Sequence, residues 1–259
     1  MPLISDFDQW ANLYDKVYDD VTCDIPFYLN EASKINGSVL ELGCGTGRMT
    51  IPMAKVGIDV TGVDISPAMI CKLREKAASS GVILKSHVMD MRYLKLDQIY
   101  QLVVVPYRGF QSIMDVKGQE KCLNSIHRHV EHGGKVVIDM FVPSRELFDQ
   151  YNDISYQVKE ISSCASRVVT TVWHRSNFDR HNQTIETCLK IESIVGGIVK
   201  ESKYVNFNLK YLYTQEAEYL FKNCGFRVNE LYGGFNGEPF GESSTNMVWI
   251  LESEKKSNA

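Results

Sequence analysis

The residues with the clearest capacity for chemistry lie between positions 39 and 64. An apolar run over residues 39–42 leads into three glycines spaced Gly-x-Gly-x-Gly, at positions 43, 45 and 47. Glycine has no Cβ, so such a loop turns sharply and lets a ligand approach the backbone closely. A second apolar run ends at Asp64, where a doubly wound α/β sheet places a carboxylate on the ribose hydroxyls of an adenosine-containing ligand. Together the two features predict a site for such a ligand.

Residue 48 decides between two interpretations of the glycine loop (residues 43–47). In the nicotinamide fingerprint Gly-x-Gly-x-x-Gly, counted from Gly43, the sixth position requires Gly or Ala so that helix and strand pack closely beside a pyrophosphate. Here that position is Arg48. An arginine suits a ligand that has a free carboxylate and no pyrophosphate, which disfavours an NAD-dependent oxidoreductase.

The segment Glu41-x-Gly-Cys-Gly-Thr-Gly-Arg48, followed by Gly62-Val-Asp-x-Ser-x-x-Met69, resembles the cofactor signature of class I S-adenosylmethionine-dependent methyltransferases. The resemblance implies an α/β fold with a doubly wound, seven-stranded and mostly parallel Rossmann-like sheet. It also implies S-adenosylmethionine as cofactor and S-adenosylhomocysteine as product. The acidic residue that accepts a hydrogen bond from the adenine amino group in this family corresponds to Asp90.

Residues just after each predicted strand are the first candidates for binding the cofactor, because ligands gather at the carboxyl ends of parallel strands. Backbone amides of the glycine loop, near a helix start, can hold the cofactor carboxylate. Glu41 either reaches the cofactor ammonium or orders the glycine loop, and Cys44 is expected to pack in the interior. The predicted cofactor-binding residues are Tyr14, Glu41, Gly43, Cys44, Gly45, Thr46, Gly47, Arg48, Asp64, Ile65, Met69, Asp90, Met91, Arg92 and Pro106.

A second set of residues, mostly aromatic, is expected to contact the methyl acceptor. Tyr14-Asp-x-x-Tyr18 resembles an element of small-molecule methyltransferases whose tyrosine meets the cofactor carboxylate or the acceptor; a core position for Tyr14 is the other interpretation. Arg108 suits an anionic or carbonyl-bearing acceptor, or pairs with a carboxylate of the inserted segment 151–209. Tyr14 and His174 are the candidate catalytic groups, His174 as a base. The predicted acceptor-binding residues are Tyr18, Tyr107, Arg108, Phe110, Tyr156 and Trp173.

Alternating strands and helices must position these residues, and such alternation indicates a parallel sheet with right-handed crossovers. Ser66-Pro67 marks a helix start, and Gly133-Gly134 marks the end of a helix near His132. Pro52 lies inside a predicted helix, which should therefore bend or start irregularly. The predicted helices are 7–21, 47–56, 67–79, 117–131 and 214–224, and the predicted core strands are 38–43, 58–63, 82–89, 101–106, 135–142, 226–232 and 245–252.

Between the two parts of this core the pattern changes. Short segments rich in Val, Ile, Thr and Tyr, at 154–161, 166–176, 184–193 and 199–209, are separated by turn-like residues and predict an antiparallel meander. The meander resembles the β lid of small-molecule methyltransferases. We therefore expect N-terminal covering helices over 1–36, a methyltransferase core over 37–150 and 210–259, and a lid insertion over 151–209.

The composition limits the kinds of substrate and partner that the protein is expected to bind. The formal charge of −4, the pI of about 5.9 and the scattered Lys and Arg residues argue against a nucleic-acid substrate. Seven cysteines show no Cys-x-x-Cys pair, and the three histidines at 127, 129 and 132 lack metal-site spacing, so no metal is expected. No apolar run is long enough to span a bilayer and no signal peptide is visible. We expect a cytoplasmic monomer or homodimer.

The predicted function is transfer of a methyl group to an N or O atom of a small molecule by in-line displacement. The cofactor supplies the electrophile, so the protein chiefly aligns donor and acceptor and excludes water. Two alternatives stay open from the sequence: a methyltransferase acting on protein or RNA, and a non-catalytic module that binds S-adenosylmethionine.

Overall fold

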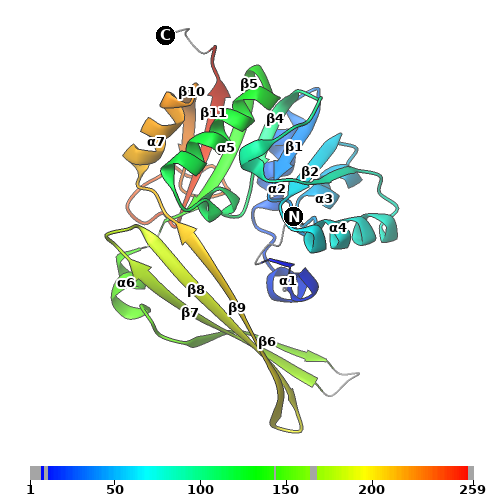
Figure 1. The fold of residues 1–259 in the computed structure, drawn as a ribbon, viewed down its shortest axis with the longest axis vertical. Helices are drawn as coiled ribbons and strands as arrows, with labels where there is room; N and C mark the ends of the chain where they lie inside the picture. The colour runs from blue at the N-terminus through cyan, green and yellow to red at the C-terminus, as the bar shows by residue number, and fades with distance from the viewer. Residues whose placement is uncertain (1–6, 9–10, 143, 164–167, 256–259) are drawn as a thin grey trace.

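The computed structural model describes residues 7–8, 11–142, 144–163 and 168–255. These residues form a seven-stranded sheet flanked by helices and a four-stranded sheet that extends away from one end of it (Figure 1). The predicted Rossmann-like fold with an antiparallel insertion is therefore confirmed.

The larger sheet has the strand order β10-β11-β5-β4-β1-β2-β3. β11 runs antiparallel to its neighbours β5 and β10, and the other neighbouring pairs are parallel. The strand order reverses between β1 and β4, which is where an open α/β sheet forms its ligand crevice. The strands are β1 (Val39–Leu42), β2 (Val60–Asp64), β3 (Lys85–Val88), β4 (Tyr100–Val105), β5 (Val130–Phe141), β10 (Phe226–Tyr232) and β11 (Asn246–Ser253).

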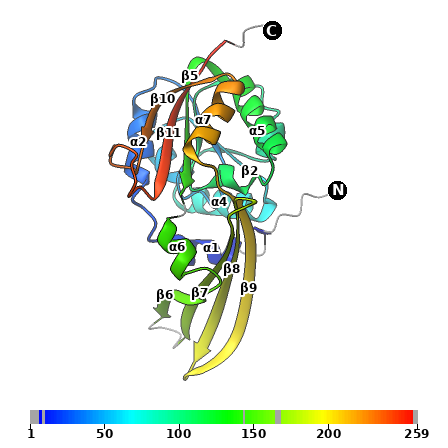
Figure 2. The ribbon, with the colours of Figure 1, turned by 90° about the vertical axis from the view of Figure 1, so that its left-hand side faces the viewer.

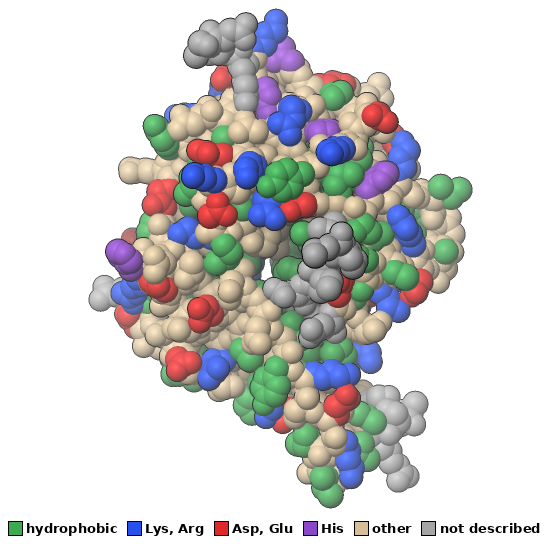
Figure 3. All heavy atoms as spheres, in the orientation of Figure 1, with side chains coloured by type: hydrophobic (Ala, Val, Ile, Leu, Met, Phe, Trp, Pro, Cys, Tyr) green, Lys and Arg blue, Asp and Glu red, His purple; other side chains and the backbone are tan. Residues whose placement is uncertain are grey.

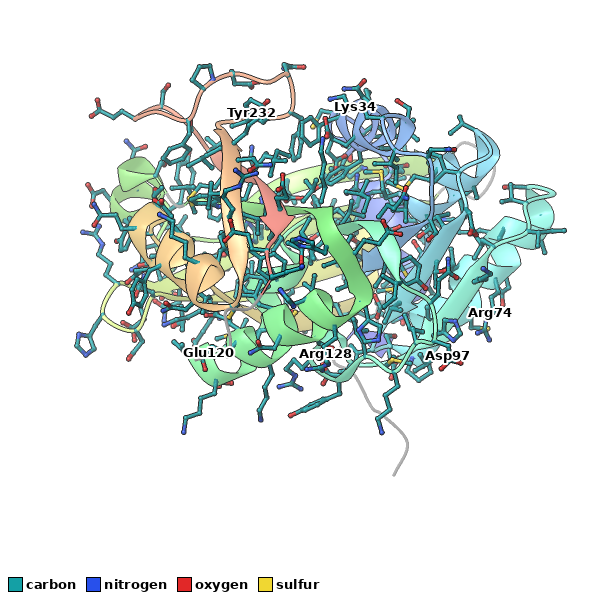
Figure 4. All side chains as sticks on the ribbon, turned by 90° about the horizontal axis from the view of Figure 1, so that it is seen from above. Lys34, Arg74, Asp97, Glu120, Arg128 and Tyr232 are labelled. Atoms are coloured by element: carbon teal, nitrogen blue, oxygen red, sulfur yellow. The ribbon has the colours of Figure 1, made fainter. Side chains whose placement is uncertain are left out.

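Both faces of the central strands are buried, as continuous apolar runs require in a parallel sheet. Val39 packs in a cluster with Phe27 and Met53, whereas Leu40 packs in a cluster with Leu123 and Phe221 on the other face. Seen from above, Lys34 of one layer and Glu120 of the other lie on opposite sides of the sheet (Figure 4). The helices of the two layers are α2 (Ile25–Ser33) and α3 (Thr50–Lys55) on the first face, and α5 (Val116–His129) and α7 (Thr214–Asn223) on the second.

Helix starts follow the sequence signals closely. Helix α4 (Pro67–Ser79) has the predicted bounds, and the Oγ atom of Ser66 accepts a hydrogen bond from the Met69 amide at 3.1 Å. Helix α3 begins only at Thr50, so Pro52 lies in its first turn and the preceding residues are irregular, as expected.

The predicted end of helix α5 is wrong. The helix stops at His129, and Gly133, with φ +77°, lies inside strand β5 instead of capping a helix. Val130 already pairs with Tyr100, and the register then shifts before Lys135 pairs with Leu102. The left-handed glycine therefore accommodates an irregularity of the strand, a role that sequence alone does not distinguish from a helix cap.

The smaller sheet, called the lid below, is the predicted meander with strand order β6-β7-β8-β9. All its pairs are antiparallel. Its strands are β6 (Tyr156–Ser163), β7 (Val168–Asp179), β8 (Thr184–Val195) and β9 (Ile198–Lys210). Figure 2 shows the short helix α6 (Arg145–Gln150) beside the upper part of these strands. The domain boundaries given above stay predictions.

Helix α1 (Ala11–Tyr18) joins the lid to the core and is shorter than predicted. Ala11 and Val17 share an apolar cluster with Met69 of α4 and with Val172 and Leu189 of the lid. Trp10, part of the predicted apolar stripe, lies outside the described residues.

The surface charge is mixed. On the face drawn in Figure 3, basic and acidic side chains are interspersed.

Candidate active site

The glycine loop is fixed against the end of β2 by backbone and carboxylate hydrogen bonds. The Gly43 amide donates to the Val63 carbonyl oxygen at 2.8 Å, and the Gly45 amide donates to Oδ2 of Asp64 at 2.8 Å. Oδ1 of Asp64 accepts from the Ser66 amide, also at 2.8 Å, and burial raises the pKa of this carboxyl group. A Cβ on Gly45 would meet nothing within 4 Å, so this side of the loop faces open space.

Two adjoining cavities, of about 150 and 330 Å³, share Gly43, Asp64, Ile65 and Met91 in their walls and form one cofactor cleft. The cleft combines a carboxylate at a strand end with apolar walls and open backbone, which fits the ribose, adenine and methionine parts of S-adenosylmethionine. The predicted cofactor residues that line it are Tyr14, Gly43, Gly45, Asp64, Ile65, Met69, Asp90, Met91, Arg92 and Pro106.

The other predicted cofactor residues lie behind the loop. Glu41 is buried and accepts a hydrogen bond from Oγ1 of Thr50 at 2.5 Å, and burial raises its pKa to about 8. Cys44 is buried, and burial raises the pKa of its thiol. Thr46 donates to Oδ1 of Asp15 at 2.6 Å and so ties the glycine loop to α1. Gly47, with φ +87°, packs against α4, where a Cβ would collide with the side chain of Leu73.

Arg48 lies at the back of the site. Its guanidinium forms a two-pronged ion pair with Asp24, at 2.6 and 2.7 Å, and donates to the Val21 carbonyl oxygen at 2.9 Å. It also lies over the ring of Tyr107, 4.7 Å from the centroid. The arginine thus anchors the start of α2 to the glycine loop, and its predicted contact with the cofactor carboxylate stays a prediction.

Asp90 lies in the wall of the cofactor cleft, and its contact with the adenine amino group stays a prediction. Its carboxylate accepts from the Arg92 amide at 2.9 Å and pairs with the Arg92 guanidinium at 2.6 Å. Asp90 therefore starts the short 3-10 helix η2 (Met91–Tyr93), which places the Met91 side chain in the cleft wall.

A larger cavity of about 380 Å³ lies between α1, the end of β4, β5 and the inner face of the lid; we call it the acceptor cavity. It meets the cofactor cleft at a shared wall. The wall residues common to the two are Tyr18, Tyr107, Arg108, Phe207 and Leu209.

Tyr107 and Arg108 adopt left-handed backbone conformations, with φ +53° and +64°. Such conformations strain residues with large side chains and persist only where the surroundings impose them. Asp139 of β5 holds the two residues in these conformations. Its carboxylate accepts hydrogen bonds from the Tyr107 amide at 2.7 Å, from the Arg108 amide at 3.3 Å and from the Tyr28 hydroxyl at 2.5 Å. Sequence analysis missed Asp139, and its only signal was a carboxylate within an apolar strand.

His174 lies in the wall of the acceptor cavity. Its Nδ1 is hydrogen-bonded to the Tyr156 hydroxyl at 2.8 Å and its Nε2 to Oγ of Ser176 at 3.0 Å. Ser176 is in turn 3.0 Å from Oγ1 of Thr187. Burial, and after it the charge of Arg108, lower the pKa of His174. The ring is therefore neutral at neutral pH.

Two predicted acceptor residues lie elsewhere. Trp173 is not in the cavity wall; its indole N–H donates to Thr171 at 3.2 Å. Successive side chains of a strand point to opposite faces, so the placement of His174 in the cavity directs its neighbour Trp173 away from it. Phe110 is fully buried in the core, with its ring centroid 6.2 Å from that of Phe221. The interpretation of both residues as cavity lining is therefore corrected.

The strand order and the cleft at its reversal point define a Rossmann-like α/β fold, and comparison with known proteins indicates the class. Residues 39–134 match the family model described as Methyltransferase domain. The chain is 25% identical over 217 residues to the cypemycin N-terminal methyltransferase of a Streptomyces species, covering 83% of this chain and 82% of that one.

Two solved structures show the same fold. The CcbJ methyltransferase from Streptomyces caelestis has a TM-score of 0.83 at 24% identity, covering 98% of this chain and 100% of that one. An S-adenosylmethionine-bound amino pentose methyltransferase from Micromonospora echinaspora has a TM-score of 0.72 at 15% identity, covering 93% and 96%. The chain therefore contains a methyltransferase domain, and it has the fold of S-adenosylmethionine-dependent methyltransferases. In the described part of the chain, no helix is long and apolar enough to cross a membrane.

Proposed function

We propose that the protein transfers a methyl group from S-adenosylmethionine to a nitrogen or oxygen atom of a small molecule held in the acceptor cavity. The observation that carries this proposal is the wall shared by the cofactor cleft and the acceptor cavity, to which Tyr18, Tyr107 and Arg108 belong. A volume of about 380 Å³ lies within the range of small-ligand pockets.

The residues of the cofactor cleft would hold the nucleoside. Asp64 would accept the ribose hydroxyls and Asp90 the adenine amino group, with Ile65, Met69 and Met91 against the adenine ring. Amides of the glycine loop and the Tyr14 hydroxyl would orient the methionine part. Bound there, S-adenosylmethionine supplies an electrophilic methyl group on a sulfonium.

A proton must leave an amine or hydroxyl acceptor for the reaction to proceed. We assign this task to Tyr156 and His174, whose hydroxyl and Nδ1 atom are 2.8 Å apart. The Tyr156 oxygen would take the proton of the acceptor while its own proton passes to Nδ1 of the neutral imidazole. Ser176, hydrogen-bonded at Nε2, keeps the ring in the required orientation.

The names of the relatives support an acceptor that is a nitrogen atom or a small molecule, and they do not identify one compound. One methylates the N-terminus of cypemycin according to its name, and another is an amino pentose methyltransferase. The lid over the acceptor cavity favours a small ligand over a protein or RNA surface.

Transfer of label tests the proposal. The protein is incubated with S-adenosylmethionine labelled in its methyl group and with cell extract that has been separated by molecular size. We expect label in the low-mass fraction, and no transfer with an Asp64→Ala variant. Label that moves only to macromolecules would support the alternative substrates instead, and cofactor binding without any transfer would indicate a non-catalytic module.

A further inference from the structure

The guanidinium of Arg108 has a setting unlike that of the other cations near the site. It lies over the Phe141 ring, 4.6 Å from the centroid, and 5.7 Å from that of Tyr107. Among the described residues it makes no ion pair or side-chain hydrogen bond. By contrast, Arg48 pairs with Asp24, and Arg92 with Asp90.

The predicted alternative, a pairing of Arg108 with a carboxylate of the lid, is not found in the described part of the chain. The other cation in the cavity wall, Lys159, pairs with Asp19 and Asp20 from the chain that follows α1. Lys159 is therefore already compensated, and Arg108 is the uncompensated charge in the described wall. A partly buried cation without a partner is unfavourable.

The ring under the Arg108 guanidinium indicates which cavity it faces, because Phe141 lines the acceptor cavity and is not among the residues that line the cofactor cleft. The charge of Arg108 acts to lower the pKa of Tyr18, Tyr156 and His174, all in the wall of the acceptor cavity, although burial dominates each value. For Tyr14, which lines only the cofactor cleft, the arginine that acts in this way is Arg48. Arg108 therefore serves the acceptor side.

We infer that the methyl acceptor carries a carboxylate, which Arg108 binds close to the reacting nitrogen or oxygen. The inference rests on the proposed function and narrows its substrate to an amino or hydroxy acid with an apolar body. The apolar body would lie against lid side chains of the cavity, including Phe178, Ile185 and Leu189. A carboxylate matches the planar guanidinium geometry and compensates its charge.

The carboxylate of the cofactor is the other possible source of the anion, so the test is carried out with the cofactor site already filled. Protein saturated with S-adenosylhomocysteine is titrated calorimetrically with 3-phenylpropionate and, separately, with its uncharged analogue 3-phenylpropanamide. We expect the acid to bind at least about tenfold more tightly than the amide. We also expect Arg108→Met to abolish this difference while the affinity for S-adenosylhomocysteine changes less than about threefold.

Two further variants make the test specific. Arg175→Met removes an exposed guanidinium of the lid that lies outside the acceptor cavity, and it should leave the acid-to-amide ratio unchanged. Arg108→Asn removes the charge with a residue that tolerates the left-handed backbone, so it replaces Arg108→Met if that variant does not fold. Far-UV circular dichroism and a cooperative urea unfolding transition demonstrate folding in each case.

Three results would overturn the inference. The first is no preference for the acid in the wild type, including the case in which neither compound binds at millimolar concentration, and the second is a preference that survives loss of Arg108. The third is a loss of S-adenosylhomocysteine affinity in a folded Arg108 variant, which would assign this arginine to the cofactor carboxylate. Because binding is measured without turnover, these results are distinct from a failure of the label-transfer experiment.

Discussion

The cofactor cleft and the acceptor cavity share a wall, yet they are built in different ways. Much of the cleft is formed by the ends of β1, β2 and β3, with backbone amides and the buried carboxylate of Asp64 at its centre. The acceptor cavity is formed by side chains from α1, the β4 loop, β5 and the lid, which are distant in sequence. The difference indicates that recognition of the cofactor depends on local backbone geometry, whereas selection of the acceptor depends on long-range packing.

The largest effect is expected at Asp64. Its carboxylate accepts hydrogen bonds from the amides of Gly45 and Ser66, so Asp64→Ala leaves both amides without this partner and also removes the predicted ribose contact. We expect S-adenosylhomocysteine affinity, measured by calorimetry, to fall about 100-fold. Asp59→Ala is the matched control, because Asp59 is exposed and pairs with Lys85 only at 3.7 Å. Affinity of the Asp64 variant within threefold of the wild type would contradict this account of the cleft.

A second effect tests the packing behind the glycine loop. Gly47 and Gly57 have nearly the same φ, +87° and +88°, but a Cβ on Gly47 would collide with Leu73, whereas one on Gly57 would meet nothing within 4 Å. Gly57→Ala should therefore lower the free energy of unfolding by about 1 kcal/mol, the cost of the left-handed backbone. Gly47→Ala should lower it by about 3 kcal/mol because overpacking adds to this cost.

Urea denaturation of the two alanine variants measures the difference. Equal losses would mean that Leu73 moves aside without cost, and the loop would then be held by its hydrogen bonds alone.

The smallest effect concerns the acceptor side and the protonation of His174. Burial and the charge of Arg108 lower its pKa, so we expect the ring to titrate below the ordinary value of about 6.5. Arg108→Met should raise this pKa without restoring it fully, since burial remains. The Cε1 proton signal, followed by NMR against pH and assigned with His174→Gln, measures both values.

The sign of the stability effect follows from the same shift. The unfolded chain binds a proton at His174 more readily than the folded chain does, so this residue lowers stability as the pH falls below about 6.5. His174→Gln should remove that contribution to acid destabilisation. An unchanged pKa of His174 in Arg108→Met would show that Arg108 does not face this side of the cavity.

Much of the core could be predicted because its signals are local. Ser66-Pro67 places the start of α4 at the observed residue, and the glycine loop with Asp64 marks the crevice. Residues whose position depends on distant partners were less predictable. Phe110 follows β4 directly, but its packing against Phe221 of α7 buries it in the core. The only local signal of Asp139 was a carboxylate within an apolar strand, because its partners Tyr28, Tyr107 and Arg108 lie far from it in the chain.

The sequence by itself indicated a site for an adenosine-containing ligand, since glycine spacing and a carboxylate at the next strand end constrain the backbone within a few dozen residues. The tertiary structure alone decided which side of the lid faces the acceptor, placing His174 in the cavity and Trp173 outside it. Alternation along a strand separates these two neighbours, but only the packing of α1 against Val172 and Leu189 selects the face that turns inward. It likewise decided that Arg48 is paired and that Arg108 has no ion pair among the described residues, because ion pairing depends on distances between segments that composition and spacing do not encode.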